Sequence, residues 1–285
     1  MKKIVFALAL LISTWYVSAQ QLEKSLLWEI SGNGLEHSSY LFGTIHMSCD
    51  ATLDKDVLNA LDKTSLLVLE LDMDDASMQG KMLKYMFMKD EKSLKDFLSE
   101  EEFTLLGNFY KSELGIDISA LSKVKPFFLG AMVYPKLLNC PIQSLENELM
   151  KVAHEQEEEV IGLESVEEQM AIFDDIPYED QIKDLLKSAK DSMKTDRENF
   201  DKLLKTYNNE DITALYELTQ EDKTLSTSVH ADKLLTNRNK NWIPKIIELS
   251  QDQPTFFGVG AAHLGGNNGV IELLRNEGFK VKAVK

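Results

Sequence analysis

The sequence has no apolar run long enough to cross a membrane. The apolar stretch from Ile4 to Ile12 is far shorter than the roughly 20 residues that a spanning helix needs. Two lysines precede it and small residues follow it, which is the pattern of a secretory signal peptide. We therefore expect residues 1–20 to be removed, leaving a mature chain of residues 21–285 in the periplasm or outside the cell. No cysteine directly follows the run, so a lipid anchor is not indicated, and we expect no membrane anchor in the mature chain.

The sequence also lacks an excess of basic residues. It has 31 lysines and arginines against 47 acids, and its formal net charge is −16. The lysines alternate with acids, as in "DKDVLNALDK" and "MKDEKSLKDF", and no basic stripe is present to offset nucleic-acid phosphates. We therefore expect no nucleic-acid partner, and we interpret most of the acids as solvated helix faces.

Cysteine is nearly absent. Cys49 and Cys140 are the only two, and a disulfide between them is compatible with the oxidising compartment that the signal peptide predicts. Sequence alone does not show whether their Cα atoms lie within bridging distance. We favour this bond over a catalytic thiol, because neither cysteine has an obvious activating partner nearby in the sequence.

No low-complexity linker or change of composition divides the chain. Predicted strands open and close the mature sequence, and long helical stretches fill about 76–157 and 166–250. The nearly continuous apolar run "SLLVLELD" is typical of a strand buried on both faces of a parallel sheet. These patterns predict one α/β domain with a central mixed β-sheet and large helical insertions.

Histidine is scarce, yet two of the five histidines share one pattern. "YLFGTIH" and "FFGVGAAH" each place a strand, a glycine and two more residues before a histidine, His46 and His263. Glu70 and Glu164 also lie at predicted strand ends, where ligands of α/β sheets gather. Two imidazoles and two carboxylates suit manganese, cobalt or zinc, with bound water as the nucleophile and a glutamate as general base. The ordinary alternatives are loop histidines and surface or helix-capping glutamates, but the repeated motif favours ligands.

The segment "LLTNRNKNW" supplies a further candidate. Arg238 and Asn239 lie between apolar residues, so they could face a partly buried pocket. Arg238 could clamp a substrate carboxylate or stabilise an oxyanion, and the alternative is a surface salt bridge. We regard His37, His154 and His230 as ordinary polar residues, and "HEQEE" lacks the second histidine of a zincin helix.

Five segments carry a resemblance to a known family, in the order "YLFGTIH", "LLVLELD", "IGLESVEEQ", "TNRNKNW" and "FFGVGAAHLGGNNGVIELLRNEGFKV". Together they make the chain, from about 26 to 284, similar to the TraB/GumN family. That family is related to the Tiki proteins and more distantly to the erythromycin esterase-like superfamily. The resemblance implies one α/β domain whose paired Gly-x-x-His motifs and acidic residues form a metal-dependent active site.

The related Tiki proteins are membrane-anchored proteases that trim the amino-terminal region of Wnt proteins, with manganese or cobalt as activating metal. TraB-type relatives are linked to the shutdown of peptide pheromones. By motif, His46 and His263 match the paired histidines, and Glu70, Glu164 and Arg238 fall in matching segments. This chain departs from Tiki in showing no membrane anchor, so a Wnt-like substrate does not follow.

These patterns lead to one main hypothesis, a secreted metal-dependent peptidase or related hydrolase. In it, His46, His263 and one of Glu70 or Glu164 hold the metal, the other glutamate accepts the proton of water, and Arg238 stabilises the tetrahedral intermediate. Two alternatives remain: a non-catalytic protein that binds a peptide or small ligand, and a metal-free hydrolase that activates water with histidine and glutamate. The sequence leaves the substrate and the oligomeric state open.

Overall fold

The computed structural model describes residues 22–285, so the predicted signal peptide lies outside the described residues. One six-stranded mixed sheet forms the centre, in the order β4-β3-β5-β2-β1-β6. Its strands are β1 (Leu27–Ser31), β2 (Ser39–Thr44), β3 (Leu66–Leu71), β4 (Glu159–Glu164), β5 (Phe256–Gly260) and β6 (Lys280–Ala283). This confirms the predicted α/β class, with a mixed sheet built from both ends of the chain.

The sheet is parallel in one part and antiparallel in the other. β2, β5, β3 and β4 run parallel, whereas β1 is antiparallel to both β2 and β6. All six residues of β2 and four of the six in β3 are buried, because helices cover both faces of these strands. Parallel strands end at the same edge, so the segments after β2, β3, β4 and β5 meet there.

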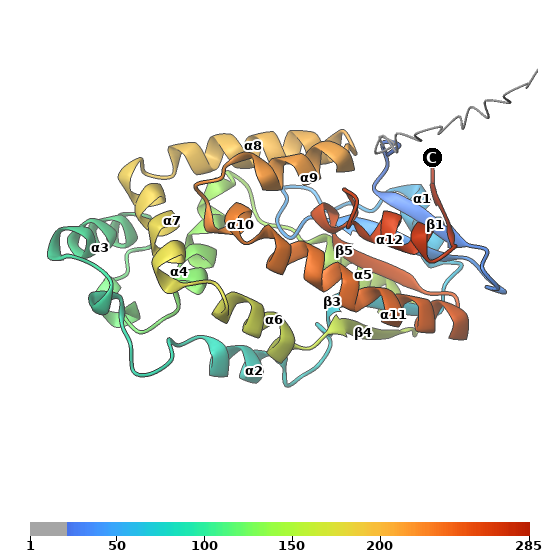
Figure 1. Cartoon of the computed structure of the whole chain (residues 1–285), viewed down its shortest axis with the longest axis horizontal. Helices are drawn as coiled ribbons and strands as arrows, with labels where there is room; N and C mark the ends of the chain where they lie inside the picture. Colours follow the sequence, from blue (N-terminus) through green and yellow to red (C-terminus); the bar gives the residue numbers. More distant parts are fainter. Residues whose placement is uncertain (1–21) are drawn as a thin grey trace, which may run out of the picture.

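Helices surround the sheet and extend beyond it (Figure 1). α11 and α12 pass in front of the strands and α5 lies behind them, while α3, α4 and α7 form a separate helical region. The helices are α1 (Lys55–Leu61), α2 (Met78–Tyr85), α3 (Glu100–Leu114), α4 (Pro126–Val133), α5 (Leu145–Glu155), α6 (Val166–Asp174), α7 (Tyr178–Lys190), α8 (Lys194–Asn208), α9 (Ile212–Glu221), α10 (Ser226–Val229), α11 (Asn237–Asp252) and α12 (Val270–Asn276).

Two hydrophobic clusters hold these parts together. The larger one packs both faces of the sheet and includes the fully buried Trp28, Phe256 and Phe257. The smaller one joins α3, α4 and α7 through residues such as Leu106 and Leu129. Each large apolar side chain removed from water contributes about 2 kcal/mol, so both clusters stabilise the fold.

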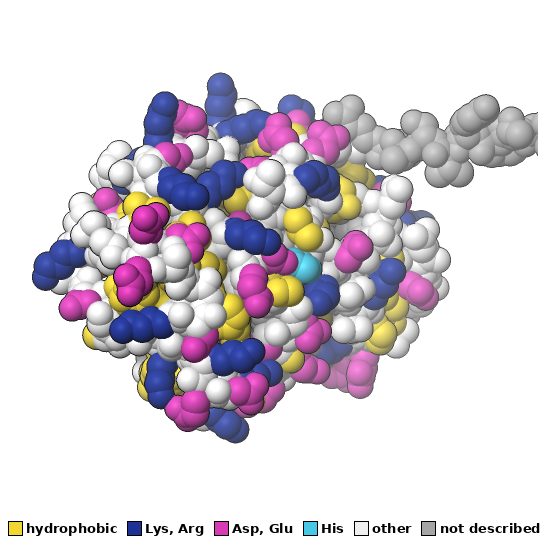
Figure 2. Space-filling view, turned by 60° about the vertical axis from the view of Figure 1, so that its left-hand side comes forward, with side chains coloured by type: hydrophobic (Ala, Val, Ile, Leu, Met, Phe, Trp, Pro, Cys, Tyr) yellow, Lys and Arg dark blue, Asp and Glu magenta, His cyan; other side chains and the backbone are white. Residues whose placement is uncertain are grey.

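Charged side chains of both signs lie on the outer surface (Figure 2). On the face shown in Figure 2, basic and acidic side chains alternate, and no basic stripe gathers on it. Within residues 22–285, no helix combines the length and the apolar character needed to cross a membrane.

Candidate functional site

The four predicted strand-end residues lie along one edge of the sheet. Glu70 is the next-to-last residue of β3, Glu164 ends β4, and His263 belongs to the short 3-10 helix η5 (Ala261–His263) directly after β5. His46 follows β2 by two residues. The structure therefore places these side chains at the carboxyl ends of four parallel strands, as the sequence predicted.

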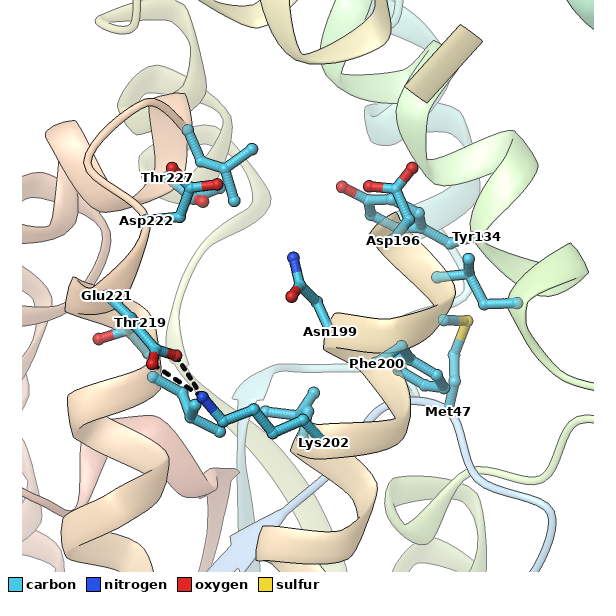
Figure 3. A pocket seen from close by; sticks show the side chains of 14 residues that line it. Met47, Tyr134, Asp196, Asn199, Phe200, Lys202, Thr219, Glu221, Asp222 and Thr227 are labelled. Carbon is cyan, nitrogen blue, oxygen red and sulfur yellow. Dashed lines mark hydrogen bonds and ion pairs between the residues drawn. The ribbon is translucent and has the colours of Figure 1, made fainter. Parts of the chain in front are cut away.

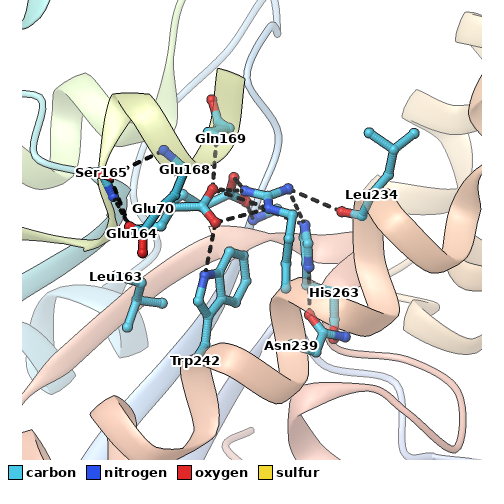
Figure 4. A network of polar contacts seen from close by, with 12 residues as sticks. Glu70, Leu163, Glu164, Ser165, Glu168, Gln169, Leu234, Asn239, Trp242 and His263 are labelled. Carbon is cyan, nitrogen blue, oxygen red and sulfur yellow. Dashed lines mark hydrogen bonds and ion pairs between the residues drawn. The ribbon is translucent and has the colours of Figure 1, made fainter. Parts of the chain in front are cut away.

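Figure 4 shows Glu70, Glu164 and His263 around one network of polar contacts. Arg238 connects these three side chains. Its Nη2 lies 2.6 Å from Glu70 Oε2 and 2.5 Å from Glu164 Oε1, and its Nη1 lies 3.0 Å from His263 Nε2. Nε also donates to Glu164, and Nη1 donates to the carbonyl oxygen of Leu234. All five N–H groups of the guanidinium are thus engaged. Arg238 is 9% exposed, so this is a buried network and not a surface salt bridge.

The local backbone explains how Arg238 reaches this position. A π-helical turn, η4 (Asp232–Thr236), directly precedes α11, and Arg238 and Asn239 are both buried at the start of that helix. Their neighbour Trp242 donates from Nε1 to Glu164 Oε2 at 3.2 Å. Turns of this kind are rare and often occur at functional sites.

His263 is held in one tautomer. Asn239 Nδ2 donates to the carbonyl oxygens of His263 and Asn268, which turns its Oδ1 towards His263 Nδ1 at 2.6 Å. Because arginine can only donate, Nε2 of His263 accepts from Arg238 and Nδ1 carries the proton. Burial, helped by the positive charge of Arg238, lowers the pKa of His263 to about 3, so the ring is neutral.

Glu70 is an ionised carboxylate in this network. Its Oε1 accepts from the backbone N–H of Gly260 at 2.8 Å and lies 3.7 Å from His263 Nε2. Burial works to raise the pKa of Glu70 and is the largest single effect, but the positive charge of Arg238 acts together with other lowering contributions, among them His46 and the Gly260 N–H. Their sum holds the pKa well below its ordinary value. A Cβ on residue 260 would lie 3.2 Å from Glu70 Oε1, so the glycine of the second motif permits this close approach.

His46 makes no hydrogen bond to this network within the described residues and pairs with Glu146, which the sequence patterns did not predict as a site residue. His46 Nδ1 lies 2.8 Å from Glu146 Oε1, and the Ser144 hydroxyl donates to Glu146 Oε2 at 2.7 Å. The imidazole itself is exposed, whereas Glu146 is 8% exposed. The hydrogen bond to Glu146 raises the pKa of His46 to about 9, so the ring is protonated at neutral pH.

A disulfide joins the chain segment that carries His46 to the segment that precedes Glu146. Cys49 and Cys140 are bonded, with Cα atoms 5.6 Å apart. Next to the bond, the backbones of Ser48 and Gln143 exchange two hydrogen bonds of 3.0 and 2.9 Å. The loop that carries His46 is thus joined to the segment that leads into α5 and Glu146.

His46, Glu70 and Glu146 all line one cavity of about 390 Å³. Leu69, Met73 and Met78 provide an apolar part of its wall. The cavity therefore combines a protonated imidazole, an ionised carboxylate and room for an apolar ligand group.

The positions of these side chains decide whether the predicted ligands could bind a divalent metal together. Within residues 22–285, no group of three or more histidine, cysteine, aspartate or glutamate side chains is placed to hold a metal ion. Arg238 takes the position between Glu70, Glu164 and His263, and the Nε2 lone pair of His263 already accepts from it. The predicted ligands therefore do not fit a divalent metal in this arrangement.

Comparison with known proteins supports the resemblance seen in the sequence. The protein named Metalloprotease TIKI1 from Danio rerio is 42% identical over 53 residues, which cover 18% of this chain and 11% of that relative. No solved structure matches the chain. The model of the TraB/PrgY/gumN family matches residues 26–283, almost the whole described chain, and the chain belongs to this family.

Proposed function

We propose that this chain is a hydrolase that cleaves peptide bonds in the cavity shared by His46, Glu70 and Glu146. The observation that carries the proposal is the placement of an imidazolium and a carboxylate on one cavity at the carboxyl ends of β2 and β3. The short match to a relative named as a metalloprotease supports peptide as the substrate class.

In this proposal His46 is the general acid. Glu146 accepts a hydrogen bond from Nδ1–H and fixes the ring, which leaves Nε2–H free to donate. At neutral pH the ring carries the proton needed by the departing amine. Glu146 is a positioning residue, because it acts on the substrate only through His46.

Glu70 is the general base in this proposal. Its carboxylate is ionised at neutral pH and lines the same cavity, so it can accept a proton from water as the water attacks the carbonyl carbon. Its low basicity means that the proton moves only as the attack develops. Arg238 and the Gly260 N–H hold this carboxylate in place.

No step of this mechanism passes through a metal, because Arg238 occupies the centre of the predicted ligand set. Of the three hypotheses drawn from the sequence, the geometry thus best supports hydrolysis by histidine and glutamate. We further propose that the mature chain acts in the periplasm or outside the cell; the Cys49–Cys140 bond supports an oxidising compartment.

A turnover assay tests the proposal. A defined mixture of synthetic peptides is incubated with the mature protein, and new termini are counted by mass spectrometry. His46→Ala is expected to reduce the cleavage rate by about 100-fold or more, because it removes the acid. His154→Ala is the matched control: His154 is also exposed and carboxylate-paired, 2.9 Å from Asp74, but lies outside this cavity.

We expect cleavage to persist after treatment with a chelator. Equal cleavage by wild type and His46→Ala would contradict the assignment of the acid. Loss of all cleavage with chelator, and recovery with manganese, cobalt or zinc, would show that a metal takes part.

One observation favours a second candidate, a protein that binds peptides without cleaving them. Arg238 has no free donor and His263 has no free lone pair, so their network is closed on itself. A binding protein would retain and protect peptides in the same assay, and no new termini would accumulate.

A further inference from the structure

Figure 3 shows a second cavity, whose wall includes Met47, the residue directly after His46. It has a volume of about 370 Å³ and lies between α8, the ends of α9 and α10, and the 3-10 helix η3 (Tyr134–Leu137). The proposed mechanism does not use it. Its apolar lining residues are Met47, Leu137, Phe200, Leu203, Leu218 and Leu225.

Three carboxylates also line this cavity, and two of them have a lysine partner. Glu221 accepts from Lys202 at 2.6 and 2.8 Å, and Asp222 accepts from Lys187 at 2.5 Å. Figure 3 shows the Lys202–Glu221 pair bridging α8 and α9 across one side of the cavity.

The third carboxylate, Asp196, differs from the other two. It forms no ion pair with another residue in the 22–285 range, and its Oδ2 atom is buried there without a hydrogen-bond partner. Burial raises the pKa of this carboxyl. The Asp196 side chain as a whole is only partly buried and lines the cavity, so a cationic ligand group in the cavity would stabilise its ionised form.

The second cavity and the proposed active site are lined by consecutive residues of one loop. Met47 is part of the wall of the second cavity, and the preceding residue, His46, lines the cavity that contains Glu70. Consecutive Cα atoms are only about 3.8 Å apart. A peptide whose scissile bond lies at His46 could therefore place a nearby side chain in the second cavity.

We propose that this second cavity is a specificity subsite for a basic side chain of the peptide substrate. The aliphatic stem of a lysine or arginine would lie against Phe200, Leu203 and Leu218, and its charged end would meet Asp196. Long basic side chains bury their stems in this way while their charge remains paired. The formal net charge of −16 would also attract a basic peptide.

The subsite rests on the proposed peptide substrate, but its test measures binding and needs no cleavage. Three acetylated, amidated tripeptides, Ala-Lys-Ala, Ala-norleucine-Ala and Ala-Glu-Ala, are titrated into the mature protein by calorimetry. The lysine peptide is expected to bind about tenfold more tightly than the norleucine peptide, which has nearly the same stem but no charge. Asp196→Asn is expected to remove that difference, whereas Asp201→Asn, an exposed aspartate on the same helix, is expected to leave it unchanged.

A second variant places a cation of the protein itself in the cavity. Asn199 is exposed and points towards the centre of the cavity in Figure 3, so Asn199→Lys is expected to fold and to weaken binding of the lysine peptide by about tenfold. Equal binding of the lysine and norleucine peptides, no binding at millimolar concentration, or a lysine preference that survives Asp196→Asn would overturn the subsite. Selective binding without any cleavage would leave the subsite standing and refute the hydrolase, whereas cleavage without selective binding would refute the subsite alone.

Discussion

Replacing Arg238 with methionine is expected to lower the free energy of unfolding by about 3–5 kcal/mol, the usual cost of removing one partner from a buried charge network. Glu70 and Glu164 are 12% and 7% exposed, and both depend on Arg238 for their counter-charge. His263 would lose the donor to its Nε2 atom at the same time. Urea denaturation followed by circular dichroism measures the effect.

The dependence of this loss on pH provides a check. In the wild type, Arg238 is the largest of several contributions that together outweigh burial and hold the pKa of Glu70 below its ordinary value of 4.5. The ionised carboxylate therefore stabilises the fold above that pH, and this stabilisation is lost as pH falls towards the lowered pKa. Without Arg238, the largest of the lowering contributions is lost, so burial would move that pKa upwards. The deficit of Arg238→Met should therefore be largest near neutral pH and smaller in acid.

Two further variants complete the Arg238 experiment. Adding Glu70→Gln and Glu164→Gln to Arg238→Met should recover most of the lost stability, because no buried charge then lacks a partner. Arg197→Met is the control, since Arg197 is 41% exposed and its contact with Glu113 is 4.0 Å long. Equal free energies of unfolding for Arg238→Met and Arg197→Met would contradict the prediction, because they would show that the Arg238 network does not stabilise the strand ends.

Removing the disulfide by Cys49→Ser with Cys140→Ser is expected to lower the free energy of unfolding by about 4.5 kcal/mol in a chain-entropy model. The bond joins residues 91 positions apart, so it strongly restricts the unfolded chain. The closed segment includes α1, β3 and α2 to α4. In urea denaturation, the double variant and the fully reduced wild type should have the same unfolding midpoint, below that of the oxidised wild type.

The same bond should also affect the proposed acid. Because it joins the loop of His46 to the segment before Glu146, its removal is expected to reduce cleavage even under conditions where the variant remains folded. An unchanged unfolding midpoint after complete reduction would show that the bond contributes little to the fold.

The strands could be predicted because their chemistry is local. β3 is an apolar run of strand length, and β1 and β2 flank a turn rich in glycine and asparagine. The order of the strands in the sheet could not be predicted from the sequence. β5, from the far end of the chain, pairs with both β2 and β3 and thus separates two strands that are neighbours in sequence. Such pairing depends on long-range packing that no local pattern records.

The site could be predicted in part for the same reason. Strand ends are visible in sequence, and the structure brings Glu70, Glu164 and His263 together there. Glu146 was missed because it lies 100 residues from His46, and an acid in the first turn of a helix is an ordinary feature. The signal that could have drawn attention to it is Cys140, since the predicted disulfide brings this segment towards His46.

The pH dependence of kcat/KM for peptide cleavage tests the central claim most directly. If His46 is the acid, cleavage by the wild type falls as pH rises through about 9, where His46 loses its proton. Glu146→Gln should move that fall towards the ordinary histidine pKa of 6.5, because the hydrogen bond to Glu146 is the main cause of the raised value. Glu148→Gln, on the same helix, should leave it in place. A fall at the same pH in Glu146→Gln, or cleavage that increases through pH 9, would contradict the account.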